Sequence, residues 1–325
     1  MNPDAFSVGA VLYTPASDSA VAGRIISSAW PCLTSICLCL EDAIRDSALA
    51  EAEAQLAATL QTLSQSTARL PMIFVRVKSP AHLRHVHALL GPLERLLKGY
   101  IFPKFDLSNG EAWLDALEAV NDDGPGGLCA MPILESRPVA AVATRPGQLT
   151  ELRALLDAQG DRILNIRVGG NDFCNLFGLR RTVSQTIYDL GVVRDILVDI
   201  VNVFGDAYVI SGPVWEYYGP DRNAPWAAGL RRELELDYAN GFFGKTAIHP
   251  AQLPVIYESL KAPAADVADA RQLLNWSDER LGVAAGSGRM NELKCHGKWA
   301  ERILLRAEIY GVRGEAPDEI GRAHV

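Results

Sequence analysis

The fold and the site of this chain depend on residues 163–172, Ile163-Leu164-Asn165-Ile166-Arg167-Val168-Gly169-Gly170-Asn171-Asp172. This apolar run ends in an acidic residue, and residues 131–135 (Met-Pro-Ile-Leu-Glu) end in the same way at Glu135. A buried strand has no reason of its own to finish on a carboxylate, because an unpaired buried charge is costly. Two consecutive parallel strands of this kind would hold two carboxylates side by side, as Mg²⁺ sites do. The pattern is typical of an enzyme.

Working outward from these segments, apolar runs of strand length recur along the chain with helical stretches between them. They cover residues 10–13, 35–40, 72–77, 99–102, 128–134, 163–168, 207–210 and 243–248, the last being the weakest. The runs are continuous and do not alternate with polar residues. This pattern favours parallel strands that are buried on both faces.

Amphipathic or Ala- and Leu-rich stretches between these runs predict helices over residues 46–60, 82–97, 146–158 and 183–204. About eight strand–helix units indicate an α/β fold, a TIM (β/α)₈ barrel with a C-terminal helical extension. The main rival is a doubly wound open sheet. It usually has fewer strands and a Gly-rich first turn, which this sequence does not contain.

The chain changes character after Pro250, and we predict a barrel domain over residues 1–260 with an extension and tail over 261–325. In the extension we expect a helix over 262–283, a flexible break at 284–288, a final amphipathic helix over 299–310 and a disordered tail from Gly314. The final helix could pack on a neighbouring subunit.

Composition excludes several classes of function. The 325 residues carry a net charge of −8 and no basic stripe, so we expect no nucleic-acid partner. No apolar run approaches the length of a membrane span, and the N-terminus lacks the features of a signal peptide. The six cysteines form no CxxC pair, which favours free thiols and a cytoplasmic location.

Polar and ionisable residues follow the predicted strands where a barrel places its active site. Glu135 and Asp172 would bind Mg²⁺ and leave coordination positions for a 2-oxo acid or carboxylate. The alternative for either residue is a helix cap or an ion pair with an arginine.

Glu41, Asp42 and Arg76 form the second part of this predicted site. The two acids could cap the next helix, or one could act as a general base or hold a metal-bound water. Arg76 lies in an apolar strand and could bind a substrate carboxylate and an enolate oxygen, or pair with Glu41 or Asp42. Lys104 could be a second cation or a Schiff-base nucleophile.

Three further residues are expected to bind substrate. Gly170 and Asn171 precede Asp172 in a turn where glycine allows close backbone approach to a ligand; the alternative is a tight strand–helix turn. His249 ends the eighth predicted strand. Three histidines at positions 82, 85 and 87 share one predicted helix, where we expect them at the surface and not as metal ligands.

Several of these segments also carry a family resemblance. In chain order they are Cys39-Leu40-Glu41-Asp42-Ala43, Phe74-Val75-Arg76-Val77, Phe102-Pro103-Lys104, Glu135, Gly170-Asn171-Asp172-Phe173 and Gly244-Lys245-Thr246-Ala247-Ile248-His249-Pro250-Ala251-Gln252. The set resembles the motifs of the citrate lyase β-subunit/HpcH–HpaI aldolase superfamily over about residues 8 to 260. The segment from His296 to Arg302 is similar to a divergent carbon–carbon bond lyase subgroup associated with bacterial stress and tellurite-resistance gene clusters.

The resemblance implies a Mg²⁺-dependent carbon–carbon bond lyase or aldolase that acts on a 3-hydroxy acid or its CoA thioester through an enolate. It implies metal binding by Glu135 and Asp172, substrate binding by Arg76, and water or proton transfer by Glu41 and Asp42. Departures from the family pattern, among them Lys78 in place of an asparagine and an insertion at residues 215–220, bear on how a CoA tail is held.

Two other functions stay open at this point. Phosphoenolpyruvate or phosphoryl chemistry on a similar barrel would need further cations, for which Lys104, Arg137 and Arg167 are available. A non-catalytic ligand-binding barrel subunit is the third reading. We expect a homo-oligomer, a trimer or hexamer, with a small-molecule carboxylic acid or acyl-CoA as substrate.

Overall fold

The computed structural model describes residues 2–276 and 282–314, and the chain divides into two compact units at residues 256 and 257. The first unit contains eight parallel strands that follow one another around a barrel. Their bounds are β1 Ala10–Pro15, β2 Ser35–Cys39, β3 Met72–Arg76, β4 Leu97–Phe102, β5 Cys129–Leu134, β6 Ile166–Val168, β7 Ile210–Ser211 and β8 Lys245–Ala247.

Each strand pairs in parallel with the next one along the chain, and β1 also pairs with β8. A single bridge between Gly212 and Lys245 joins β7 to β8. The predicted TIM barrel is therefore confirmed. The last three strands are shorter than the apolar runs that predicted them. Before β6, Ile163 forms an isolated bridge with Ala130 of β5, and residues 164–165 and 207–209 lead into β6 and β7.

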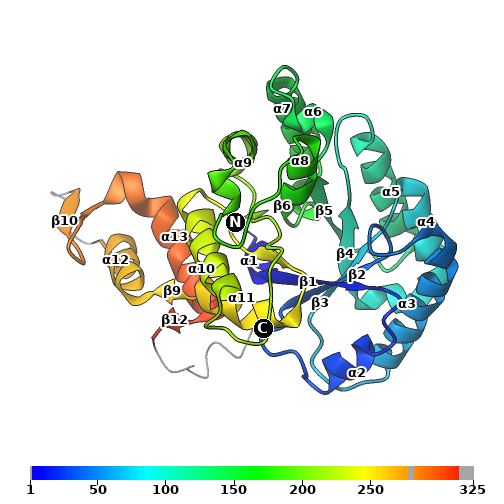
Figure 1. The fold of residues 1–325 in the computed structure, drawn as a ribbon. Coiled ribbons are helices and arrows are strands. Elements are labelled where there is room, and N and C mark those ends of the chain that lie inside the picture. The colour runs from blue at the N-terminus through cyan, green and yellow to red at the C-terminus, as the bar shows by residue number, and fades with distance from the viewer. Residues whose placement is uncertain (1, 277–281, 315–325) are drawn as a thin grey trace. The chain divides into compact units, whose positions relative to one another are not determined.

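Helices cover the outside of the strands, with α2 to α5 beside β1 to β4 and α6 and α8 beside β5 and β6 (Figure 1). The bounds are α1 Pro3–Ser7, α2 Val21–Ile26, α3 Leu49–Ser64, α4 Pro80–Leu90, α5 Gly110–Asp123, α6 Arg137–Ala140, α7 Arg145–Asp157, α8 Gly170–Leu176, α9 Gly191–Phe204, α10 Pro225–Ala239 and α11 Leu253–Leu260.

The helix predicted over residues 183–204 begins later than expected, at Gly191. The preceding residues form a short 3₁₀ turn, Ile187–Asp189, which is fixed by a capping box. In this box the Asp189 carboxylate accepts hydrogen bonds from the backbone N–H and the hydroxyl of Thr186. These local hydrogen bonds compete with helix formation and set its start.

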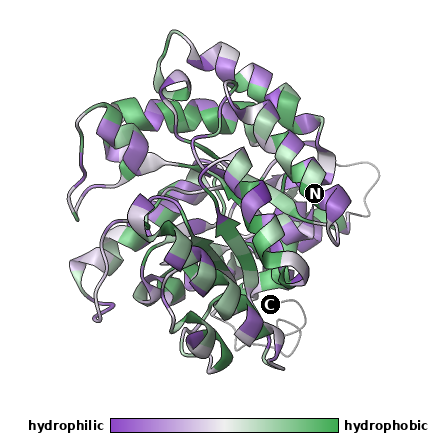
Figure 2. Cartoon of the chain, turned by 90° about the vertical axis from the view of Figure 1, so that its right-hand side faces the viewer, coloured by the Kyte–Doolittle hydropathy of each residue, from purple (hydrophilic) through white to green (hydrophobic). Residues whose placement is uncertain are grey.

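Alternate residues of the strands point to opposite sides of the barrel wall. One set, which includes Ile36, Leu38 and Val75, packs against the helices in the main apolar core. The other set points inward, and the ring of Tyr13 on β1 lies 5.8 Å from the guanidinium of Arg167 on β6. Figure 2 shows the strands in the hydrophobic colour and the helices with mixed faces.

The second unit contains α12 (Ala264–Leu274), a hairpin of β10 (Val283–Ala285) and β11 (Met290–Glu292), and α13 (Leu293–Tyr310). The short strands β9 (Ala262–Pro263) and β12 (Val312–Arg313) pair in parallel. The helix predicted over 262–283 was thus too long, and the predicted break forms part of the hairpin. The tail predicted as disordered begins at Gly314, and its residues 315–325 lie outside the described residues.

Within residues 2–276 and 282–314, no helix is both long and apolar enough for a membrane span.

Candidate active site

Six ionisable residues meet at the carboxyl ends of five consecutive strands, and we call them the rim cluster. Glu41 and Asp42 follow β2, Arg76 is the last residue of β3, and Lys104 follows β4. The remaining two follow β5 and β6, as predicted, and they are Glu135 and Asp172. In a TIM barrel this end of the strands carries the active site.

The two carboxylates predicted to bind metal lie against the same glycine. A methyl group added at Gly169 would come within 2.2 Å of Glu135 Oε2 and 3.0 Å of Asp172 Oδ2. The other oxygen of Glu135, Oε1, accepts a hydrogen bond of 2.9 Å from the backbone N–H of Lys104. Glu135 is therefore fixed on one side and faces Asp172 with the other.

Two carboxylates this close in a buried place repel each other. Burial raises the pKa of Glu135 to about 8, and the neighbouring charge of Asp172 adds to the effect. A divalent cation between the two oxygens would remove this repulsion, and Mg²⁺ is commonly held by one or two carboxylates with water at its other positions. The residues present fit such an ion. The described residues contain no cluster of three or more acids, histidines or cysteines that could hold a metal.

Arg76 lies at the centre of the rim cluster. Its Nη2 is 2.8 Å from Glu41 Oε2, 3.2 Å from Asp42 Oδ2 and 3.5 Å from Glu135 Oε1. The side chain is buried, so the three carboxylates stabilise a cation that the apolar strand alone would not tolerate. The predicted ion pairs of Arg76 with Glu41 and Asp42 both form.

Glu41 and Asp42 differ in what surrounds them. Glu41 is buried and accepts hydrogen bonds from its neighbour's backbone N–H (2.7 Å) and from Lys104 Nζ (2.8 Å), in addition to the Arg76 contact. The Asp42 side chain is 58% exposed. Burial acts to raise the pKa of Asp42, but the hydrogen bond with Glu41 and the two nearby cations outweigh it and hold that pKa below its usual value.

Lys104 adopts a left-handed backbone conformation, with φ of 51°. This conformation is unfavourable for a residue with a Cβ, and such strain often occurs at functional sites. Here it aims the backbone N–H at Glu135, while Nζ reaches Glu41. The hydrogen bond to Glu41 raises the pKa of Lys104, so its amine stays charged. A charged amine suits a second cation of the site better than a nucleophile.

The other predicted substrate-binding residues lie in different surroundings. Gly170 packs against Pro213, since a methyl group there would lie 2.7 Å from Pro213 Cβ, and Asn171 is exposed. His249 accepts a hydrogen bond from the Ala251 N–H through Nδ1. Its ring stacks on Tyr218 of the predicted insertion, with centroids 4.3 Å apart. The structure places Gly169, and not Gly170, against the acidic pair.

We expected all three histidines of α4 at the surface, but the structure places only one of them there. His85 is exposed, but His82 is buried and its Nε2 lies 2.9 Å from Glu53 Oε1. His87 contacts the buried Glu94 at 2.8 Å. Burial lowers the pKa of His82, with Glu53 opposing the effect.

Sequence reasoning missed a second charged cluster, which packs outside β8. Lys245 Nζ donates to Glu233 Oε1 and to Asp237 Oδ2, each at 2.7 Å, and Arg181 Nη1 donates to Glu233 Oε2 at 2.8 Å. We call these four residues the wall cluster. All are at most 1% exposed. Lys245 is part of the segment 244–252 that carried the family resemblance. Its partners come from a loop and from α10, and no local sequence pattern indicates that these segments meet.

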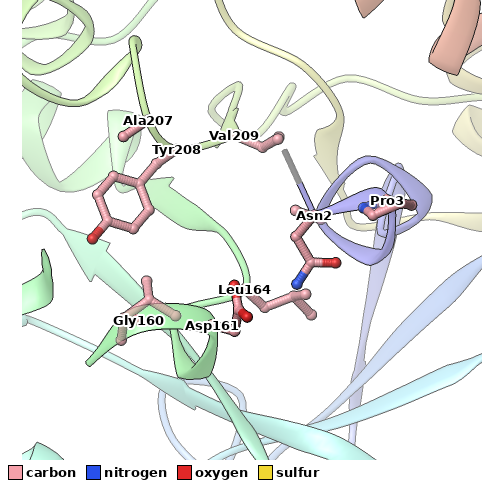
Figure 3. Close-up of a pocket in the computed structure, with 10 residues that line it drawn as sticks. Asn2, Pro3, Gly160, Asp161, Leu164, Ala207, Tyr208 and Val209 are labelled. Atoms are coloured by element: carbon pink, nitrogen blue, oxygen red, sulfur yellow. The ribbon is translucent and has the colours of Figure 1, made fainter. Parts of the chain in front are cut away.

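A pocket of about 530 Å³ lies at the opposite end of the barrel. Figure 3 shows it between α1 and the segments that lead into β6 and β7, with Asn2, Asp161 and Tyr208 among its lining residues. These residues precede their strands, so the pocket is at the amino ends of the strands. It is separate from the rim cluster, which is at the carboxyl ends.

The closed ring of eight parallel strands, with the rim cluster at their carboxyl ends, defines a protein of the TIM-barrel class. The chain belongs to the carbon–carbon bond lyases of the TIM-barrel fold, whose family profile matches residues 2–312. The predicted carbon–carbon bond lyase family is thereby confirmed, and the protein is a carbon–carbon lyase. No curated protein sequence matches the chain.

Solved structures of citrate lyase-like proteins have the same fold. A citrate lyase from Burkholderia xenovorans LB400 has a TM-score of 0.73 at 16% identity, with 97% of this chain and 95% of that chain covered. The protein CitE from Mycobacterium tuberculosis, in complex with magnesium, acetoacetate and coenzyme A, has a TM-score of 0.59 at 19% identity, covering 92% and 97%. The M. tuberculosis citrate lyase β subunit with oxaloacetate and magnesium has a TM-score of 0.51 at 18% identity, covering 80% and 99%.

Proposed function

We propose that this lyase is Mg²⁺-dependent and cleaves or forms a carbon–carbon bond in a 3-hydroxy acid, as the free acid or as its CoA thioester, through an enolate. One observation carries the proposal. The oxygens of Glu135 and Asp172 face each other over Gly169 in a buried place, with an excess of negative charge around them. Four carboxylates of the rim cluster face only two cations, Arg76 and Lys104.

When bound at this pair, Mg²⁺ would supply a Lewis acid for the oxygens of the substrate. Arg76 would bind the substrate carboxylate and stabilise the oxygen on which negative charge develops. Glu41 would hold Arg76 and Lys104 in place through its two oxygens. Both oxygens of Glu41 are occupied by these contacts, so Glu41 is a positioning residue.

Asp42 is the better placed of the two acids for proton transfer, because it is exposed and ionised at neutral pH. In the cleavage direction, the Asp42 carboxylate takes the proton of the substrate hydroxyl. The hydroxyl oxygen becomes a carbonyl as the carbon–carbon bond breaks, and the electron pair of that bond passes to the enolate fragment. Asp42 then returns the proton to the enolate carbon, so that the residue and the charge are restored.

The relatives support the choice of ligand class. The M. tuberculosis structures contain magnesium together with acetoacetate and coenzyme A, or with oxaloacetate. These are small acids and an acyl carrier of the kind that the rim cluster would accept.

The test is a calorimetric titration with Mg²⁺, followed by a screen of free 3-hydroxy acids and 3-hydroxyacyl-CoAs for Mg²⁺-dependent cleavage. We expect Glu135→Gln and Asp172→Asn to lose Mg²⁺ binding and cleavage together. Asp195→Asn, an exposed position on α9, is the matched control and keeps both. Unchanged Mg²⁺ binding in the two rim variants would refute the metal site.

We also infer a cytoplasmic homo-oligomer, a trimer or hexamer, from the family resemblance and the apolar face of the final helix. Light scattering of the purified full chain gives the mass directly. A monomer at micromolar concentration would contradict the inference.

A further inference from the structure

A second arginine lies in the barrel interior without a carboxylate partner. Arg167, in the middle of β6, is 2% exposed. Its Nη2 donates to Thr246 Oγ1 on β8 at 2.6 Å, and its guanidinium lies over the Tyr13 ring. Its Nε and Nη1 are buried, and no acceptor among the described residues reaches them.

Arg167 and Arg76 differ in the counter-charge that surrounds them. Arg76 is buried as well, but three carboxylates surround it. Arg167 forms no ion pair with any residue in the described parts of the chain, although a buried cation without a counter-charge is costly. An anion brought by a ligand would provide both the charge and the hydrogen-bond acceptors, and guanidinium groups bind carboxylates through two donors at once.

The neighbours of Arg167 are accessible and polar. Tyr13 and Thr246 are each partly exposed, so both side chains join the buried guanidinium to more open parts of the structure. The Tyr13 hydroxyl forms no hydrogen bond with any part of the chain that the structure describes, and it is free to donate to an anion. Burial raises the pKa of Tyr13, so the hydroxyl keeps its proton at neutral pH.

The strand register relates Arg167 to the metal-binding pair. Arg167 is opposite Ile133 on β5, and Glu135 follows two residues later on the same face of that strand. Two residues of a strand span roughly 7 Å. A small acid of about four carbons can therefore reach from the rim cluster to the guanidinium.

We propose that Arg167, with the Tyr13 hydroxyl, binds an anionic group of the substrate, so that the substrate carries one anionic end at the rim and a second inside the barrel. This rests on the function proposed above, because the rim end is the one that would lie at Glu135 and Asp172. It makes Arg167 a specificity-determining residue that selects acids with two anionic groups over acids with one.

The test compares oxaloacetate and pyruvate, which differ by one carboxylate, in titrations of the full chain with Mg²⁺ present. We expect the wild type to bind oxaloacetate at least about tenfold more tightly than pyruvate, as a charge-assisted contact to a buried group would give. Arg167→Met should weaken oxaloacetate binding about 10- to 100-fold and change pyruvate binding less than about threefold. The phosphonate analogue 3-phosphonopyruvate shows whether the inner group is a carboxylate or a phosphate.

Two further variants keep the test decisive if Arg167→Met does not fold. Arg167→Lys keeps the charge but loses the planar fork, and Tyr13→Phe removes only the hydroxyl; both should lower the preference for oxaloacetate. Arg194→Met, at an exposed position on α9, is the matched control and should not change it. Equal binding of the two acids by the wild type, or equal losses in the variants, would overturn the proposal.

The outcome for Mg²⁺ separates this proposal from the proposed function. If Mg²⁺ binds and the preference for oxaloacetate is absent, the inner site fails and the metal site stands. If Mg²⁺ does not bind, the proposed function fails, and titration of succinate without metal decides the inner site. Binding of succinate that Arg167→Met removes supports the site, and no such binding overturns it.

Discussion

The rim cluster and the wall cluster contain similar residues but differ in balance and in access. The wall cluster pairs Arg181 and Lys245 with Glu233 and Asp237, two cations with two acids, and all four side chains are sealed from solvent. The rim cluster has four acids for two cations, and Asp42 and Lys104 are largely exposed. The excess of acid and the exposure are the reasons for proposing the rim cluster as the ligand-binding site.

The balance of the wall cluster explains why it is stable without any ligand. Further hydrogen bonds reach its acids, from the Ile187 N–H to Glu233 and from the Tyr188 hydroxyl to Asp237. Burial raises the pKa of Asp237 to about 6, and Lys245 opposes this rise. The comparison teaches that burial of charge alone does not point to a functional site, and that unbalanced charge at an accessible place is the better reason to propose one.

The largest effect is expected for activity at the rim. Asp172→Asn removes one of the two acids that would hold Mg²⁺, and the loss of several kcal/mol of transition-state stabilisation should lower kcat/KM about 10³-fold or more. Steady-state kinetics on the substrate found by the screen, at saturating Mg²⁺, measures it. The variant should stay folded with the stability of the wild type. An unfolded variant would contradict the view that the rim cluster contributes to activity and the wall cluster to stability.

For the wall cluster we expect a large change in stability. Lys245→Met leaves Glu233 and Asp237 buried without their shared cation, so the free energy of unfolding should fall by about 3 to 5 kcal/mol. Urea unfolding followed by circular dichroism measures the change. A fall below about 1 kcal/mol would show that the wall cluster is not a structural unit.

The pH dependence of stability should report on Glu135 in the metal-free protein. Its pKa is about 8 in the folded state and near 4.5 otherwise, so the folded state binds more protons than the unfolded state between these values. The free energy of unfolding therefore falls as pH rises through this window, by up to about 1.4 kcal/mol per pH unit. Urea unfolding of wild type and Glu135→Gln should diverge in this direction, and added Mg²⁺ should reduce the divergence.

A smaller effect is expected from one methyl group at the rim. Gly169→Ala would bring a Cβ against Glu135 Oε2 and displace that carboxylate, so we expect Mg²⁺ affinity to fall about 10-fold. Gly147→Ala is the matched control, because its Cβ meets nothing within 4 Å and alanine favours its helix. Calorimetry should find normal Mg²⁺ affinity in the control and reduced affinity in Gly169→Ala; equal affinities would argue against a metal at this pair.

The smallest effect concerns the stability contribution of Lys104. Its side chain is 54% exposed, so its ion pair with Glu41 is screened by solvent. Lys104→Met should change the free energy of unfolding by less than about 1 kcal/mol, in contrast to Lys245→Met. Urea unfolding of both variants side by side provides the comparison, and a loss above about 3 kcal/mol for Lys104→Met would remove the distinction between the clusters.

Much of the barrel could be predicted from the sequence, because buried parallel strands read as continuous apolar runs. The starts of β6 and β7 could not, since residues 163–164 and 207–209 continue the apolar runs but lie outside the strands, with Ile163 in an isolated bridge. The rim residues could be predicted because parallel strands bring their carboxyl ends together. The wall cluster could not, because Arg181 and Glu233 are distant in sequence and meet only when α10 packs.

Arg167 illustrates an intermediate case. An arginine inside an apolar run was the reason for singling out Arg76, and the same reasoning applies to Arg167, which was named only as an available cation. The sequence does not show whether a carboxylate lies beside each arginine. Three carboxylates surround Arg76 and none surrounds Arg167, a difference that appears only when the strands are placed in register.

The closure of the barrel between β7 and β8 has a kinetic consequence. In the described chain one residue pair, Gly212 with Lys245, and three backbone hydrogen bonds join these strands, whereas β1 and β2 share five residue pairs. This makes the seam the place where backbone amides should open first to solvent exchange. The seam hydrogen bonds of Gly212 are with the neighbours of Lys245, which are Gly244 and Thr246, while the Lys245 side chain belongs to the wall cluster. The buried ion pairs therefore hold β8 in place beside the seam. Amide hydrogen exchange at Gly212 and Thr246 would then measure how often the seam between β7 and β8 opens.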